Sequence, residues 1–329
     1  MFMRKLLAIV LAVAVAAVLL SGCTGGKTED NGKLNIVVTI FPEYDFVRAI
    51  AGDRVNLHML TPPGASTHSF EPAPGDIVKI QNADIFIYLG GESDRWVKNI
   101  LDSLDTSGIT VLRLMEHVDA YEEEIKKGMK ADGEDDRDED SHDGAYVHGS
   151  LEDPEYDEHI WTSPKNAILL IDVIRDAMCA RDSENAAVYT ENAKAYQDSL
   201  KELDARFIEV VETAARKKIV VADKFPFLYF VRAYGLDYAA AFPGCSDQAD
   251  AGAATMIHLV KTVTEENIPY VYYVELSNKN VASAISEQTG AGMLLLNSCH
   301  NVARDDFESG VTYLSLMEQN VENLRKGLN

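Results

Sequence analysis

Short apolar runs rich in β-branched residues alternate with helix-like segments along most of this 329-residue chain. Nearly continuous apolar strands separated by helices are typical of parallel sheets that are buried on both faces. We therefore expect an α/β fold of two βα lobes, each with a mostly parallel sheet. The expected strands are residues 34–38, 55–60, 85–89 and 111–114 in the first lobe, and 219–222, 238–241, 270–274 and 293–296 in the second. The expected helices are residues 43–50, 74–82 and 93–104, then 226–234, 250–266, 278–288 and 313–327.

The pattern between the two lobes predicts one long helix that joins them. Apolar residues recur at steps of three and four from Tyr189 to Ala214, without an internal glycine or proline. A helix over residues 183–216 would be roughly 50 Å long, enough to span both lobes, although packing on one lobe is the alternative. The expected organisation is an N-terminal lobe over 34–181, a connecting helix over 182–217 and a C-terminal lobe over 218–329.

The first residues resemble the signal of a bacterial lipoprotein. Arg4 and Lys5 precede an apolar run over residues 6–20, which is short for a spanning helix, and Leu20-Ser21-Gly22-Cys23 follows it. This layout predicts a signal peptide over 1–22, a lipidated Cys23 and a polar linker as far as residue 33. An ordinary signal peptide with an incidental cysteine is the alternative. The mature protein is then extracytoplasmic, anchored to the cell membrane by its lipid.

The net charge of −23 is concentrated in one segment. Residues 119–158 hold 17 acidic and 4 basic side chains, and residues 119–156 show no apolar periodicity. We expect an acidic disordered insertion over 119–156, which either gathers cations or is simply a solvated loop. The acidic balance argues against nucleic-acid partners, which require basic faces.

The cysteines after Cys23 fall in two settings. Cys179 lies on the apolar side of a helical pattern and is expected to be a buried thiol. Cys245 and Cys299 lie beside turn residues in a chain that we expect to be exported, where disulfides form. We predict a Cys245–Cys299 disulfide, with a pair of thiolates at a metal site as the alternative.

Three histidines lie where secondary-structure elements end. His68 follows a strand in a loop rich in proline and glycine, His159 lies between the acidic segment and a helix, and His300 follows the last strand. Ligands of open α/β sheets bind at the carboxyl ends of strands, and imidazole is a common ligand of divalent zinc. The pattern predicts a metal site between the lobes, although each histidine alone is also consistent with an ordinary loop residue. Phosphate-binding loops, nucleophile elbows and His-Glu-x-x-His helices are absent from the sequence.

With these residues, the chain resembles the zinc- and manganese-binding lipoproteins that serve bacterial ABC importers. The resemblance covers residues 34–328 and implies a metal receptor that is not an enzyme, is monomeric and works with a permease in the membrane. It rests on the segments 41–45, 62–72, 76–84, 159–166, 233–236 and 313–320.

The resemblance places His68 and His159 at the first two metal-ligand positions of the family. The third position is usually His or Glu and falls here on Lys224, and the fourth is usually Asp and falls on Asn297. Protonated lysine does not bind a metal. We therefore expect His300 to complete a set of three imidazoles.

Glu275 is expected as the fourth ligand, with Asp223 or a water molecule as alternatives. Strand alternation would turn Asp223 away if Lys224 faces inward. Three nitrogen ligands and one carboxylate favour Zn²⁺ over Mn²⁺, which prefers more oxygen. The expected function is an extracytoplasmic receptor that captures Zn²⁺ and delivers it to an ABC importer permease. A manganese receptor, a metal-stabilised surface adhesin and, least favoured, a metal-dependent hydrolase are the alternatives.

Overall fold

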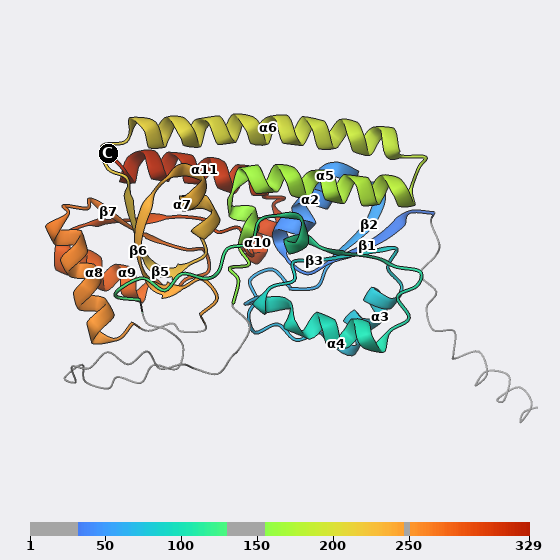
Figure 1. Cartoon of the computed structure of the whole chain (residues 1–329), viewed down its shortest axis with the longest axis horizontal. Coiled ribbons are helices and arrows are strands. Elements are labelled where there is room, and N and C mark those ends of the chain that lie inside the picture. Colours follow the sequence, from blue (N-terminus) through green and yellow to red (C-terminus); the bar gives the residue numbers. More distant parts are fainter. Residues whose placement is uncertain (1–31, 130–154, 247–250) are drawn as a thin grey trace, which may run out of the picture. The chain divides into compact units, whose positions relative to one another are not determined.

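Two parallel sheets of four strands form the centres of the two lobes, as the alternating pattern predicts (Figure 1). The computed structural model describes residues 32–129, 155–246 and 251–329, and residues 34–329 form one compact unit. Cys23, the apolar run before it and residues 130–154 of the acidic segment lie outside the described residues. Among the helices of the described residues, none is long and apolar enough to cross a membrane.

The N-terminal sheet has the strand order β2-β1-β3-β4. Its strands are β1 (Leu34–Val38), β2 (Val55–Met59), β3 (Ile85–Tyr88) and β4 (Thr110–Arg113). The helices of this lobe are α2 (Phe41–Ala51), α3 (Pro74–Gln81), α4 (Arg95–Ser103) and α5 (Pro164–Arg181), with short 3₁₀ helices η1 (Glu92–Asp94), η2 (Leu114–His117) and η3 (Ile160–Thr162). Helix α2 begins two residues before its expected start, because the Glu43 carboxylate accepts the N–H groups of Thr39 and Ile40 and Pro42 fits the first turn.

The C-terminal sheet has the strand order β6-β5-β7-β8. Its strands are β5 (Lys218–Phe225), β6 (Asp237–Pro243), β7 (Tyr270–Tyr273) and β8 (Gly292–Leu295). The helices of this lobe are α7 (Leu228–Tyr234), α8 (Ala253–Glu265), α9 (Asn280–Thr289), α10 (Arg304–Glu308) and α11 (Tyr313–Gly327). Strand β5 extends three residues beyond its expected end, which brings Lys224 into the strand.

Helix α6 (Ala186–Thr213) spans both lobes (Figure 1). It packs against α2 and α5 of the N-terminal lobe and against α7 and α11 of the C-terminal lobe. Its buried face includes Tyr189, Leu200 and Phe207, which belong to the apolar pattern seen in the sequence. The expected spanning helix is therefore present, and one core continues through both lobes along it.

Asp45 joins three of these helices at one buried point. Its carboxylate accepts hydrogen bonds from the Tyr313 backbone N–H at 2.8 Å and from the Tyr196 hydroxyl at 2.9 Å, and it pairs with Arg48. These partners lie on α11, α6 and α2, respectively. The shared carboxylate therefore fixes the three helices relative to one another at the junction of the lobes.

Residues 119–129, which we call the strap, are ordered and pack on the C-terminal lobe, contrary to the expected disorder of this part of the acidic segment. The Tyr121 N–H donates to the Tyr229 hydroxyl at 3.1 Å, which in turn donates to the Asp157 carbonyl at 2.8 Å. The strap pairs with the returning chain through an antiparallel bridge between Glu122 and Tyr156. Isolated aromatic, ionic and apolar contacts hold the strap in place. Because these contacts do not recur at a regular spacing, the sequence of the strap shows no apolar periodicity.

We predict that deleting the strap with the acidic segment destabilises the protein, while a shorter deletion does not. Met129 is buried, and replacing such a side chain by alanine alone costs about 2–5 kcal/mol. Removal of residues 119–156 should therefore lower the free energy of unfolding by at least about 3 kcal/mol in urea denaturation.

The matched variant replaces residues 132–152 by a flexible Gly/Ser linker and keeps every strap contact described above. Its free energy of unfolding should equal that of the parent chain. Equal stability of the two deletion variants would show that the strap does not stabilise the fold.

Candidate metal site between the two lobes

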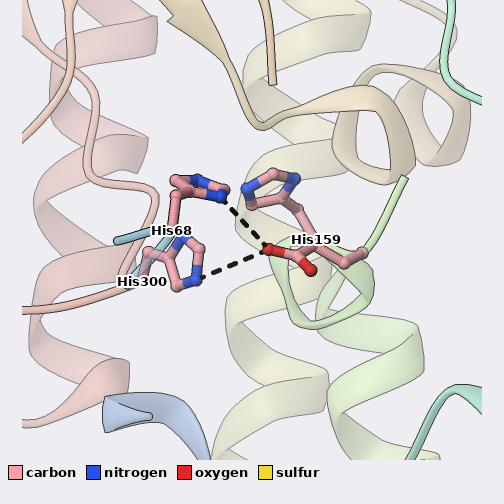
Figure 2. A group of neighbouring side chains, drawn as sticks. His68, His159 and His300 are labelled. Atoms are coloured by element: carbon pink, nitrogen blue, oxygen red, sulfur yellow. Dashed lines mark ion pairs between the residues drawn. The ribbon is translucent and has the colours of Figure 1, made fainter. Parts of the chain in front are cut away.

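Four side chains converge where loops of the two lobes meet. Among the described residues, His68, Glu158, His159 and His300 each offer a ligand atom, and these atoms all lie within 4.8 Å of one another. His68 lies between β2 and α3, Glu158 and His159 directly precede η3, and His300 lies between β8 and α10. The three histidines that the sequence singled out are thus brought together (Figure 2).

Glu158 supplies the carboxylate of this group. It is fully buried, and its Oε1 lies 3.7 Å from His68 Nδ1 and 3.9 Å from His300 Nε2, as the dashed lines of Figure 2 mark. Ser93 holds the carboxylate through its backbone N–H at 2.9 Å and through its hydroxyl. The sequence alone did not lead us to expect this residue as a ligand. The sequence signal that could have identified Glu158 as a candidate ligand is its position directly before His159.

Each imidazole is also oriented by an oxygen atom. His159 Nδ1 lies 3.1 Å from Asp157 Oδ1, His68 Nδ1 lies 3.0 Å from the Ser93 hydroxyl, and His300 Nδ1 lies 3.4 Å from the Thr67 hydroxyl. Outer partners of this kind fix the ring orientation and the tautomer of metal-binding histidines. The arrangement prepares the rings before any ion arrives.

His300 Nε2 is a buried polar atom without a hydrogen-bond partner among the described residues. Its distance of 3.9 Å from Glu158 Oε1 is too long for a hydrogen bond. A buried imidazole nitrogen left in this way costs free energy unless another group binds it. A cation between the imidazoles and Glu158 would accept its lone pair, so the residues present fit a metal ion.

The three imidazoles differ in their proton affinity. Burial and the neighbouring His159 lower the pKa of His68 to about 3, and burial with the same neighbour lowers the pKa of His300 well below its ordinary value. Burial also lowers the pKa of His159, but the carboxylates of Asp157, Glu158 and Glu123 together more than offset this, so the pKa of His159 lies above its ordinary value. His68 and His300 are therefore neutral and ready to bind a cation, whereas His159 competes for a proton.

Glu275 does not join the group of four but supports the loop that carries His300. Its carboxylate accepts hydrogen bonds from the Ser298 N–H at 2.6 Å, the Ser298 hydroxyl and the His300 N–H at 3.0 Å. These three donors occupy the oxygens that the sequence analysis expected to bind the metal. The role that the structure gives to Glu275 is to position His300.

Asp223 and Lys224 both line the cavity next to the histidines. Simple strand alternation predicted that only Lys224 would face inward, but the pairing of β5 with β6 shifts register between Val221 and Lys224. Asp223 accepts the Lys224 N–H at 2.9 Å and is not part of the group of four. The irregular strand therefore explains why the alternation argument was wrong here.

The structure corrects the prediction for the cysteines. Cys179, Cys245 and Cys299 are all free thiols, so the Cys245–Cys299 disulfide is not formed, and Cys179 is half-buried instead of buried. Burial raises the pKa of the Cys245 and Cys299 thiols, and the two sulfurs neighbour different carboxylates, Glu158 for the first and Glu275 for the second. Neither belongs to the group of possible metal ligands.

Hydrogen bonds between the loops of the two lobes hold the site together. The Trp161 indole N–H donates to the Ser298 carbonyl at 2.7 Å, and the Tyr313 hydroxyl donates to the Trp161 carbonyl at 2.7 Å. The Asn301 side-chain amide donates to the carbonyls of Pro62 and Ala65 at 2.9 and 2.8 Å. These bonds fix the loops of His159, His300 and His68 against one another.

Two parallel α/β lobes, a spanning helix and a group of metal-ligating side chains between the lobes define the class of metal-binding receptors with the substrate-binding-protein fold. Residues 36–327 match the family described as the periplasmic component A of the zinc-uptake complex. The chain therefore belongs to this zinc-uptake family.

Several relatives support this assignment. The zinc-binding lipoprotein AdcA of Streptococcus pneumoniae is 31% identical over 96% of this chain, which spans 60% of the length of that relative. The high-affinity zinc uptake protein ZnuA of Bacillus subtilis is 26% identical, over 96% of each chain. The crystal structure of the Zn(II)-bound ZnuA-like domain of S. pneumoniae AdcA has a TM-score of 0.71 and 29% identity, covering 90% of this chain and 99% of that domain.

We predict that Trp161→Phe destabilises the protein by removing the indole donor to Ser298. A buried carbonyl left without its partner costs about 1–3 kcal/mol. Urea denaturation should show a free energy of unfolding that is lower by this amount, in addition to the decrease caused by the smaller ring.

Trp96→Phe is the matched control, because the indole nitrogen of Trp96 has no hydrogen-bond partner among the described residues. This variant makes the same change of ring type without breaking a hydrogen bond. Equal losses in the two variants would mean that the Trp161–Ser298 bond contributes nothing to stability.

Proposed function

We propose that this protein is an extracytoplasmic receptor that binds one Zn²⁺ ion through His68, Glu158, His159 and His300. The observation that carries the proposal is the unpartnered, buried Nε2 of His300, which faces two further imidazoles and a buried carboxylate. Neutral imidazoles already held by outer partners bind a divalent cation with little rearrangement. The names of the zinc-uptake relatives support the same ion.

The donor set favours zinc over manganese. Three imidazole nitrogens and one carboxylate oxygen suit tetrahedral Zn²⁺, whereas Mn²⁺ prefers sites richer in oxygen. We propose zinc as the transported ion and manganese as a weaker competitor. Calorimetric titration of the metal-free protein with each ion in turn tests this order, and tighter binding of manganese would contradict it.

The family and the start of the sequence support delivery to a membrane importer. The Cys23 motif indicates a lipid anchor on the extracytoplasmic side, and we propose that the receptor acts there as a monomer with an ABC permease. This makes the protein a transport receptor and not an enzyme. The adhesin alternative has less support, because the laminin-binding protein Lmb of Streptococcus agalactiae is only 21% identical to this chain and is similar to it in fold alone.

His300→Ala should weaken zinc binding by more than the roughly 10–100-fold that loss of an outer partner costs, because it removes a direct ligand. The dissociation constant is measured by competition with a zinc chelator of known affinity. His58→Ala is the control, since His58 is paired with Lys79 and lies outside the group of four. A His300→Ala protein that binds zinc as tightly as the His58→Ala protein would exclude His300 as a ligand.

Zinc binding should release at most one proton, not three, near neutral pH. The lowered pKa values leave His68 and His300 neutral, so only His159, whose pKa is raised, has to lose a proton. Affinity should therefore fall as the pH drops below the pKa of His159, by about tenfold per pH unit.

Calorimetry in two buffers with different ionisation enthalpies measures this number of protons directly. Release of about three protons would show that all three imidazoles are protonated in the free site. That result would contradict the electrostatic description given above.

A further inference from the structure

The metal site opens into a cavity that is larger than a bare ion requires. Its volume is about 310 Å³, compared with roughly 10–15 Å³ for a cavity that holds one water molecule. The three histidines line it together with residues from both lobes, including Ser66, Thr67, Asp223, Lys224, Ser277 and Asn301. The space beside the ion is therefore large enough for a small organic molecule.

Lys224 is a half-buried cation on this cavity, next to Asp223, and it forms no ion pair among the described residues. The described residues form no ion pair with its ammonium group within 4.0 Å, and the adjacent Asp223 carboxylate accepts backbone N–H groups instead. Lys224 lines the same cavity as His68 and His300, and its positive charge contributes to the lowered pKa of both rings. A lysine with unused donors thus lies on the same cavity as the proposed ion.

Three of the carboxylates around the site, apart from Asp223, are already occupied. Glu158 is held by Ser93, Asp157 by His159, and Glu275 by Ser298 and His300. None of these groups is therefore paired with Lys224. A bound dication beside an unpaired ammonium group is unfavourable in a partly desolvated cavity unless an anion lies near both charges.

We propose that the cavity binds a small carboxylate together with the metal, with one carboxylate oxygen paired with Lys224 and the other directed at the ion. The ligand class is a small organic acid of the size of a hydroxy acid or an amino acid. This inference rests on the proposed zinc site. It gives a function to the lysine on this cavity.

The test uses L-lactate labelled with ¹³C at its carboxylate, a weak zinc ligand that leaves tightly bound zinc in place. The zinc-loaded protein should bind one lactate per chain in a ¹³C NMR titration, and the metal-free protein should bind it more weakly. Lys224→Met should keep its zinc but lose at least about tenfold in lactate affinity, the cost of one charge-assisted hydrogen bond. Lys224→Arg should retain lactate binding.

Lys98→Met, which removes a lysine exposed on α4, serves as the charge control and should bind lactate like the parent chain. Zinc binding without lactate binding, or equal lactate affinity in Lys224→Met, would overturn this inference and leave the zinc site standing. Failure of the parent chain to bind zinc would overturn both the site and the inference.

Discussion

The hydrogen bond from the Trp161 indole to the Ser298 carbonyl is the contact on which the site depends most. Trp161 lies two residues after His159, and Ser298 lies two residues before His300, so one bond sets the spacing of two candidate ligands from different lobes. Tyr313 holds the Trp161 carbonyl, and Asp45 holds the Tyr313 N–H. The chain of contacts thus runs from the helices at the lobe junction to the imidazoles. Helix α6 supports it by packing against both lobes, which limits how far they can separate.

Burial and charge act together on the candidate ligands of this site. Burial keeps His68 and His300 neutral, and Ser93 holds the Glu158 carboxylate beside them. Asp157 increases the basicity of His159, which strengthens that imidazole as a donor but makes it compete for a proton. The combination favours capture of a cation near neutral pH and weaker binding in acid.

The sequence predicted the fold well because its signals were local. The β-branched runs gave the strands, the three-four periodicity from Tyr189 gave the spanning helix, and histidines at the ends of elements gave three of the four grouped residues. The remaining features depend on tertiary contacts. Packing between distant segments sets three of them: the irregular strand pairing near Asp223, the backbone hydrogen bonds that Glu275 accepts, and the short distance between Glu158 and His68. The strap was missed because its contacts are single and not periodic, and the cysteine pairing was wrong because proximity to turns does not bring two sulfurs together.

The most direct test of the central claim is the anomalous diffraction of zinc-loaded crystals at the zinc absorption edge. The account predicts one strong peak between the lobes, about 2.0–2.2 Å from an imidazole nitrogen of each of His68, His159 and His300 and from a Glu158 oxygen. Glu275 should remain bound to Ser298 in the same crystals. A peak coordinated by Glu275 or Asp223 in place of Glu158, or located away from His300, would contradict the site described above.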